Sequence, residues 1–298
     1  MKFCFLIVLV CSICFTTYAQ DLEPRSYANL PKGLNAINVL YSFSSGNVLT
    51  DPSLPISDFK IDVHTIGASY FRTFELAHKL ARVQVIVPFA FMSGNLKING
   101  TDTSGERTGF GDTRIRFGVN IIGSPALDKK EFVTFKQKTI VGASVVVSMP
   151  TGIYYKEKRI NLGSHRWAFK PEVGISRRFE HVYAEAYAGV WLFTNNHEFL
   201  TSKTLVQEPV VSFQMHLCYY FKNQMWIGLD GNWFNGGETI VDNTPSGDLK
   251  DNYRIGATLS VPFSKKHSLK FQFHVGAFTN TGYDYNVVSI GYQYVFFK

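Results

Sequence analysis

The sequence predicts an all-β protein, a transmembrane outer-membrane β-barrel with about 12 antiparallel up-and-down strands. Apolar and polar residues alternate in a succession of segments, and the connections between these segments are alternately short and long. Beyond the N-terminal 19 residues, no apolar run approaches the ~18 residues that a membrane-spanning helix requires. A closed barrel crosses a membrane without helices because every backbone group bonds to a neighbouring strand.

The N-terminus has the features of an export signal. Residues 1–19 carry Lys2, an apolar core and small residues that end at Ala19, so they fit a signal peptide cleaved before Gln20. Cleavage would remove three of the four cysteines and leave Cys218 as the remaining one, which excludes an internal disulfide in the mature chain.

Residues 20–32 form a separate N-terminal periplasmic segment that lacks strand alternation and contains Pro24 and Pro31. Two interpretations of it stay open. It is a disordered leader, as chain termini commonly are, or it is a mouth segment that enters the barrel, with Glu23 or Arg25 pairing to inward charges.

Residues 33–298 form the transmembrane β-barrel as one domain, because no linker or shift in composition divides them. An even strand number is the rule for bacterial barrels. The expected strands span residues 34–45, 60–74, 79–92, 110–122, 138–149, 166–179, 182–194, 205–221, 225–234, 253–263, 268–279 and 285–297.

The lengths of the connections indicate the compartment. Bacterial outer-membrane barrels have short periplasmic turns and longer extracellular loops, whereas a water-soluble β-sandwich has no reason to sort its loops by length. The short connections lie at residues 75–78, 180–181, 222–224 and 264–267, and the long ones at 46–59, 93–109, 151–165, 195–204 and 235–252.

Period-two alternation separates a lipid face from a lumen face. In the strand expected at 110–122, Ile115 and Phe117 share one face, while Arg114 and Arg116 share the other. The apolar set belongs in lipid, and the charged set belongs in the lumen. The strands at 182–194 and 268–279 alternate in the same way.

The charged residues assigned to the lumen form a mixture of signs that is nearly balanced. We expect either a network of ion pairs that fills the lumen, since buried charges must be paired, or a path for a solute. About 12 strands should leave a constricted passage. The candidate lumen-lining residues are Arg82, Asp112, Arg114, Arg116, Lys170, Glu172, Arg178, Glu185, Glu208, Asp230, Arg254 and Lys270.

Other chemistry finds little support in the sequence. The net charge of +7 comes without a basic helix or zinc spacing, so it does not predict nucleic-acid binding. No catalytic residues, cofactor or metal site are predicted, because the eight histidines are scattered and no helix follows the glycines at 109–112. Ser164 and His165 are adjacent but lack an evident third group to orient the histidine.

The C-terminus, residues 292–298, alternates aromatic residues almost to the end of the chain, with Lys298 last. It resembles the terminal signature by which outer-membrane barrels are recognised for insertion. Barrel-assembly machinery is therefore an expected partner, together with the lipid of the outer membrane and a small solute.

Four segments together resemble the outer-membrane transporter family of the meta-pathway of phenol degradation. They are the start at 22–27 and 31–35, the glycines at 109–112, the stretch 149–152 followed by 161–167, and residues 169–174. The resemblance covers nearly all of the mature chain. It implies a barrel in the outer membrane that moves small hydrophobic or aromatic compounds, and it carries no catalytic residues.

The sequence therefore favours a passive channel for small molecules. The first alternative is a barrel with a filled lumen that serves structure or adhesion, and the second is an outer-membrane enzyme of the lipase type. A continuous lumen would favour the channel, a plug of paired side chains the filled barrel, and a serine within reach of an oriented histidine the enzyme.

Overall fold

The computed structural model describes residues 22–49 and 56–297. The expected signal peptide, residues 1–19, lies outside these described residues, as do the first two residues of the N-terminal segment.

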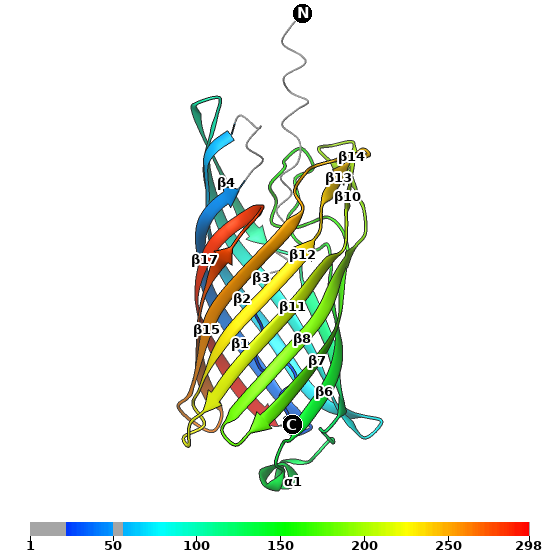
Figure 1. The fold of residues 1–298 in the computed structure, drawn as a ribbon, viewed down its shortest axis with the longest axis vertical. Helices are drawn as coiled ribbons and strands as arrows, with labels where there is room; N and C mark the ends of the chain where they lie inside the picture. Colours follow the sequence, from blue (N-terminus) through cyan, green and yellow to red (C-terminus); the bar gives the residue numbers. More distant parts are fainter. Residues whose placement is uncertain (1–21, 50–55, 298) are drawn as a thin grey trace, which may run out of the picture.

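Twelve strands of the described chain close into an antiparallel barrel (Figure 1). Each pairs with two neighbours, and the pairing of the first strand with the last, from Leu34 opposite Phe297, closes the ring. The expected fold class and strand number are thereby confirmed. The barrel strands are β1 (Leu34–Leu49), β2 (Ile56–Leu76), β3 (Lys79–Ile98), β5 (Arg114–Ile122), β6 (Thr139–Ser148), β7 (Ala168–Phe179), β8 (Val182–Phe193), β11 (Val210–Tyr220), β12 (Trp226–Gly236), β15 (Lys250–Pro262), β16 (His267–Phe278) and β17 (Gly282–Phe297).

The two ends of the barrel differ. At one, which we call the short-turn end, the chain reverses in tight turns; Ala77 and His78 both have positive φ, as a two-residue hairpin turn requires. The C-terminus and the short helix α1 (Lys129–Thr134) lie at this end, at the bottom of Figure 1. The connection that carries α1 spans residues 123–138 and departs from the short-turn pattern.

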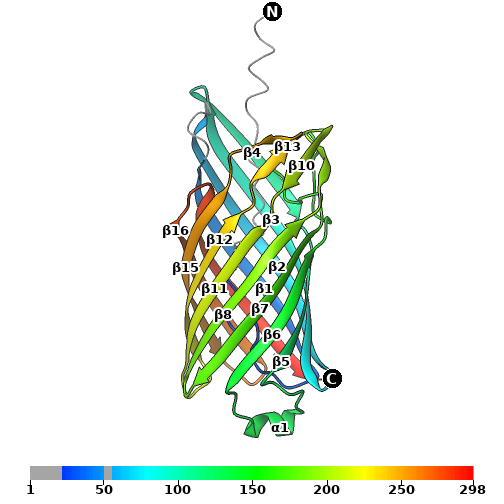
Figure 2. The same ribbon diagram turned by 45° about the vertical axis from the view of Figure 1, so that its right-hand side comes forward.

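The opposite end, the long-loop end, carries strands that extend beyond the barrel. There β4 (Thr101–Phe110) continues the hairpin begun by β3, at the top of Figure 1. A second sheet joins β9 (Asn196–Phe199), β10 (Lys203–Gln207), β13 (Thr239–Val241) and β14 (Thr244–Pro245), which Figure 2 shows beside the barrel mouth.

One expected strand is divided. Residues 205–221 were expected to be continuous, but β10 ends at Gln207 and β11 begins at Val210. Pro209 lacks the N–H that a central strand donates to its neighbour, and strands therefore end or bulge at such positions. The residues before it turn away to pair with β9 and β13.

Burial alternates along the strands as the lipid and lumen faces require. On β7 the outward Phe169, Val173 and Ile175 are 37%, 59% and 45% exposed, whereas the inward Lys170 and Glu172 are 7% and 5% exposed. The outward apolar side chains of the barrel form the surface that lipid covers. Within the described residues, no helix is long and apolar enough to cross a membrane.

Candidate functional site

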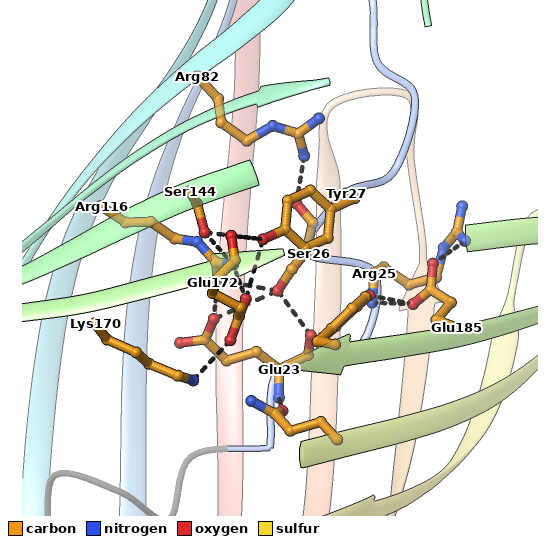
Figure 3. Close-up of polar contacts among 12 residues, drawn as sticks. Glu23, Arg25, Ser26, Tyr27, Arg82, Arg116, Ser144, Lys170, Glu172 and Glu185 are labelled. Atoms are coloured by element: carbon orange, nitrogen blue, oxygen red, sulfur yellow. Dashed lines mark hydrogen bonds and ion pairs between the residues drawn. The ribbon is translucent and has the colours of Figure 1, made fainter. Parts of the chain in front are cut away.

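The described part of the N-terminal segment, residues 22–32, lies inside the barrel against the inner faces of β5, β6, β7, β8 and β11 (Figure 3). Leu22 and Tyr27 are only 4% and 1% exposed, although they precede the first strand. The segment then leaves at the short-turn end, where the Thr73 hydroxyl donates to the Pro31 carbonyl at 2.7 Å. Lys32 pairs there with Glu75 at 3.0 Å, and this hydrogen bond raises the pKa of Lys32.

Tyr27 is held in a slot in the barrel wall. Its hydroxyl lies 3.0 Å from Ser144 Oγ, and its ring packs edge-on against Tyr187 with centroids 5.1 Å apart. Gly142 and Gly174 line the slot, and a Cβ at either position would overlap the Tyr27 ring. Glycine within a strand commonly marks a place where another group approaches closely.

Arg116 is the centre of one ion-pair network. It donates to Glu172 Oε1 at 2.7 Å, to the hydroxyl of Ser26 at 3.0 Å, and to the carboxylate of Glu23. Lys170 Nζ reaches the other oxygen of Glu172 at 2.7 Å. The carboxylates of the wall and of the segment thus share the charges of these two cations (Figure 3).

Arg25 is the centre of a second network. Its guanidinium pairs with Glu185 at 2.7 Å and lies 3.9 Å from the centroid of the Tyr183 ring, and its backbone N–H donates to the same carboxylate at 2.8 Å. Arg25 has φ of 67°, a left-handed conformation that costs a non-glycine residue about 1–3 kcal/mol and persists where its surroundings hold it. The contacts with Glu185 hold Arg25 in this conformation.

Most of the expected lumen charges face inward and make defined contacts. Arg82 donates to the backbone carbonyls of Ser26 and Ala28, the latter at 2.9 Å. Arg254 donates to the Tyr285 carbonyl at 2.9 Å and lies 3.9 Å from its ring centroid. Arg114 and Lys270 occupy inward positions of β5 and β16 and are half-buried.

Asp230 is shared between neighbouring strands. It lies 2.7 Å from His216 Nδ1 and accepts a hydrogen bond from Thr258 Oγ1 at 2.7 Å. Arg178, at the short-turn end of β7, donates from Nε to the Glu180 carbonyl at 2.7 Å.

Two of the expected lumen residues have other positions. Glu208 lies in the break between β10 and β11 and is exposed, so the alternation that placed it in the lumen does not reach it. Asp112 is 3% exposed, but it lies between β4 and β5 and holds the β6–β7 loop: it accepts hydrogen bonds from Gly152 N at 2.9 Å and Ser164 Oγ at 2.6 Å.

The two sides of the lumen differ in exposure. Inward side chains on β6, β7, β8, β11 and β12 are mostly buried, in part by the N-terminal segment. Several inward side chains on β16, β17, β1, β2 and β3 keep partial exposure, whereas others on these strands, such as Arg82 and His274, are buried; we call this side the accessible wall. Its half-exposed residues include Leu40, Ser42, Thr65, Ser69, Gln84, Lys270, Gln272 and Gln293.

Near the long-loop end, inward side chains of the same strands are apolar and pack into a buried group. Tyr283 and Tyr285 stack with ring centroids 4.3 Å apart, and the loop residue Ile160 packs against their group. We call this group the apolar cluster. It consists of Val48, Phe59, Ile61, Tyr283 and Tyr285.

Ser164 and His165 bind to different partners. The Ser164 hydroxyl donates to Asp112, whereas His165 Nε2 lies 3.2 Å from Glu198 and its ring stacks on Tyr154 at 4.7 Å. In the portion of the chain that the structure covers, no three histidine, cysteine or acidic side chains are grouped as metal ligands.

Sequence reasoning missed Tyr27 and its slot. The signal that could have found the slot is the pair Gly142 and Gly174, two inward glycines on adjacent strands that are register partners. It also missed Gln214, whose side-chain oxygen accepts from the Glu23 backbone N–H at 3.2 Å. Nothing in the local sequence singles out this residue.

A closed antiparallel barrel with an apolar exterior and a charged lumen defines an outer-membrane β-barrel protein. An outer-membrane channel from Pseudomonas putida F1 has the same fold: it is 21% identical, with a TM-score of 0.78, over 93% of this chain and 100% of that one. The transport unit of the autotransporter AIDA-I from Escherichia coli is 9% identical with a TM-score of 0.54, over 94% of each chain.

A family model described as "Putative MetA-pathway of phenol degradation" matches residues 42–287. The chain belongs to this family, which confirms the resemblance found in the sequence. No curated protein sequence matches the chain.

Proposed function

We propose that this protein is an outer-membrane channel for the passive passage of small hydrophobic or aromatic molecules. The observation that carries the proposal is the partial exposure of inward residues along the accessible wall, such as Ser42, Thr65 and Gln272. A barrel filled for structure alone would bury the inward residues on both sides of its lumen. Membership of the family supports the same conclusion.

The N-terminal segment is the constriction of this channel in our proposal. It occupies the lumen beside β5 to β8, and ion pairs from Glu23 and Arg25 hold it there. Solutes then pass between the segment and the accessible wall. We further propose that the long-loop end faces the cell exterior and the short-turn end faces the periplasm, as in other bacterial barrels.

Export and insertion belong to the same proposal. Residues 1–19 would direct export as a signal peptide. The aromatic end of β17, with Phe296 and Phe297, would present the chain to the barrel-assembly machinery.

Conductance in a planar bilayer tests the proposal. We expect the purified protein to form discrete channels, and deletion of residues 21–28 to raise their conductance because it removes the segment from the lumen. Circular dichroism should show equal strand content in both proteins. Absence of conductance in both proteins, when each is folded, would contradict the channel function. Equal conductance would contradict the constriction alone.

A further inference from the structure

We propose that the short-turn end of the barrel binds the headgroups of an anionic phospholipid, phosphatidylglycerol, through a set of exposed cations on its outer surface. This inference goes beyond the passage of a solute, and it rests on the proposed function only for the orientation of the barrel. In that orientation the short-turn end lies in the leaflet that faces the periplasm.

The exposed charges are divided unequally between the two ends of the barrel. Within residues 22–49 and 56–297, ten exposed cations and four exposed acids lie at the short-turn end. At the long-loop end the same described residues include three exposed cations, Lys60, Lys156 and Lys158, and seven exposed acids. We call the ten cations of the short-turn end the basic collar. They are Arg72, Lys79, Lys129, Lys130, Lys136, Lys138, Arg177, Lys222, Lys265 and Lys266.

The acids at the short-turn end leave the basic collar uncompensated. Glu75 and Asp128 bind Lys32, which is not part of the collar, at 3.0 and 3.5 Å. Glu131 accepts the backbone N–H of Asp128 at 2.9 Å. In the described part of the chain, no side chain of the collar forms an ion pair with an acid. The collar therefore presents a net positive charge to its surroundings.

Exposed aromatic side chains accompany the basic collar at the ends of the strands. Arg177 and Phe179 share the outer face of β7, and the guanidinium lies 5.2 Å from the ring centroid. Phe221 directly precedes Lys222, and Phe263 begins the turn between β15 and β16; these two rings are 39% and 59% exposed. Aromatic rings lie at headgroup level in membrane proteins. This arrangement favours the lipid of the surrounding leaflet over a soluble acidic protein as the partner.

The basic collar is densest on the connection that carries α1, below β6 in Figure 2. This connection holds four of the ten cations: Lys129, Lys130, Lys136 and Lys138. The backbone N–H of Arg178 donates to the Lys138 carbonyl at 2.9 Å, and Thr139 is the register partner of Arg177, so the connection ends beside an exposed guanidinium. Val133 of α1 is 79% exposed. The one connection that departs from the short-turn pattern thus combines cations with an exposed apolar side chain.

A phosphatidylglycerol headgroup fits this surface. Its phosphodiester is negatively charged and accepts hydrogen bonds, and those from Lys and Arg are stronger than neutral ones. Its acyl chains would lie against outward apolar side chains of the same strands, such as Ile175, two residues from Arg177. Clusters of Lys and Arg beside a membrane span are a common means of binding anionic lipid. Phosphatidylcholine has the same phosphate, but its own ammonium group offsets the charge.

Native mass spectrometry of the protein in detergent tests the inference. Palmitoyl-oleoyl phosphatidylglycerol is titrated in parallel with phosphatidylcholine that has the same chains. We expect phosphatidylglycerol to bind more tightly by about fivefold, the factor that corresponds to one cation beside an anionic surface. This preference should fall as salt is added, because salt screens exposed charges. Equal affinity for the two lipids would overturn the inference.

Two triple variants with the same net charge separate the basic collar from a general effect of positive charge. Combined Lys129→Gln, Lys130→Gln and Lys136→Gln should reduce the preference for phosphatidylglycerol. The matched control, combined Lys60→Gln, Lys156→Gln and Lys158→Gln at the long-loop end, should retain it. An equal reduction in both variants would overturn the assignment to the collar.

A second collar variant and a second measurement complete the test. Arg177→Gln, a single change on β7, should show a smaller reduction, and it keeps the inference testable if the triple variant fails to fold by circular dichroism. Conductance is measured on the same proteins. A conducting protein that binds both lipids equally would overturn the collar alone. A folded protein that prefers phosphatidylglycerol but does not conduct would overturn the channel and support the collar.

Discussion

Glu185 shows how far one carboxylate determines the position of the N-terminal segment. It accepts hydrogen bonds from the backbone and the guanidinium of Arg25, from Ser176 at 2.7 Å and from Tyr187 at 2.6 Å. All these donors surround a carboxylate that is 4% exposed. Its negative charge is therefore the compensation that allows the buried Arg25 to stay in the lumen.

Replacement of Glu185 by Gln should release the segment. Removal of one partner of a buried ion pair costs about 3–5 kcal/mol because it leaves the other charge uncompensated, and the segment can escape this cost by leaving its site. We expect the conductance of Glu185→Gln to approach that of the deletion of residues 21–28. Glu208→Gln, at an exposed position outside the lumen, should conduct like the wild type. Equal conductance of Glu185→Gln, Glu208→Gln and the wild type would contradict this role of Glu185.

Phe117 offers a test of the lipid face. It is 38% exposed on the outer surface of β5, so Phe117→Arg should destabilise the barrel by about 2–4 kcal/mol near the bilayer midplane. Gln272→Arg, at a half-exposed inward position, should cost less. Urea unfolding in lipid vesicles measures both, and equal losses would refute the assignment of faces.

Asn120 is another inward residue of β5, but a substitution there should not be tolerated. It is fully buried and donates to the Tyr27 carbonyl at 3.3 Å and to Ser124 Oγ at 3.0 Å. Period two indicates that Asn120 faces inward, but it cannot indicate that the N-terminal segment covers it.

At the scale of the elements, the glycine slot on β6 and β7 determines where the segment docks. A Cβ on Gly174 would overlap the Tyr27 ring, whereas one on Gly67, in the accessible wall, would meet only Leu40. Gly174→Ala should therefore displace Tyr27 and raise conductance, while Gly67→Ala should leave the segment in place. A conductance that Gly174→Ala leaves unchanged would show that the slot does not hold the segment.

The barrel strands were predictable because each turns one face to the lumen and the other to lipid, so polar and apolar residues alternate along the sequence. The strands β9, β13 and β14 are too short for this signal, at four, three and two residues. Helix α1 does carry a local signal in the sequence: Glu131 lies three residues after Asp128 and accepts its backbone N–H at 2.9 Å, as in a capping box.

The candidate site was predictable in part for a related reason. The alternation of side chains along a strand indicates that Arg116 and Glu185 face inward. Their partners, Glu23 and Arg25, lie 93 and 160 residues away in the chain. Such pairings depend on the closed barrel, so local sequence cannot specify them. Glu23 and Arg25 were expected to meet inward charges, and the particular acids and bases emerge only from the fold.

At the scale of the whole molecule, the orientation in the membrane can be tested directly. Cysteines introduced at Asp102, Lys158 and Asp242, all at the long-loop end, should react with an impermeant thiol reagent on intact cells. Cysteines at Ala77 and Asn223, at the short-turn end, should react only after the outer membrane is opened. Cys218 is fully buried and gives little background. Labelling of the cysteines at Ala77 and Asn223 on intact cells would show that the short-turn end faces the cell exterior.

The pairing of β1 with β17 also governs how the chain matures. Leu34 meets Phe297 and Leu49 meets Gly282, so the seam joins the first strand made to the last. The ring cannot close until β17 has been synthesised, and contacts of such long sequence separation form slowly. A chain truncated before Gly282 would expose the backbone groups along one edge of β1 and of β16, which hydrocarbon cannot satisfy. Ring closure thereby distinguishes copies that contain β17 from copies that lack it, since only the former satisfy the backbone groups along the edge of β1.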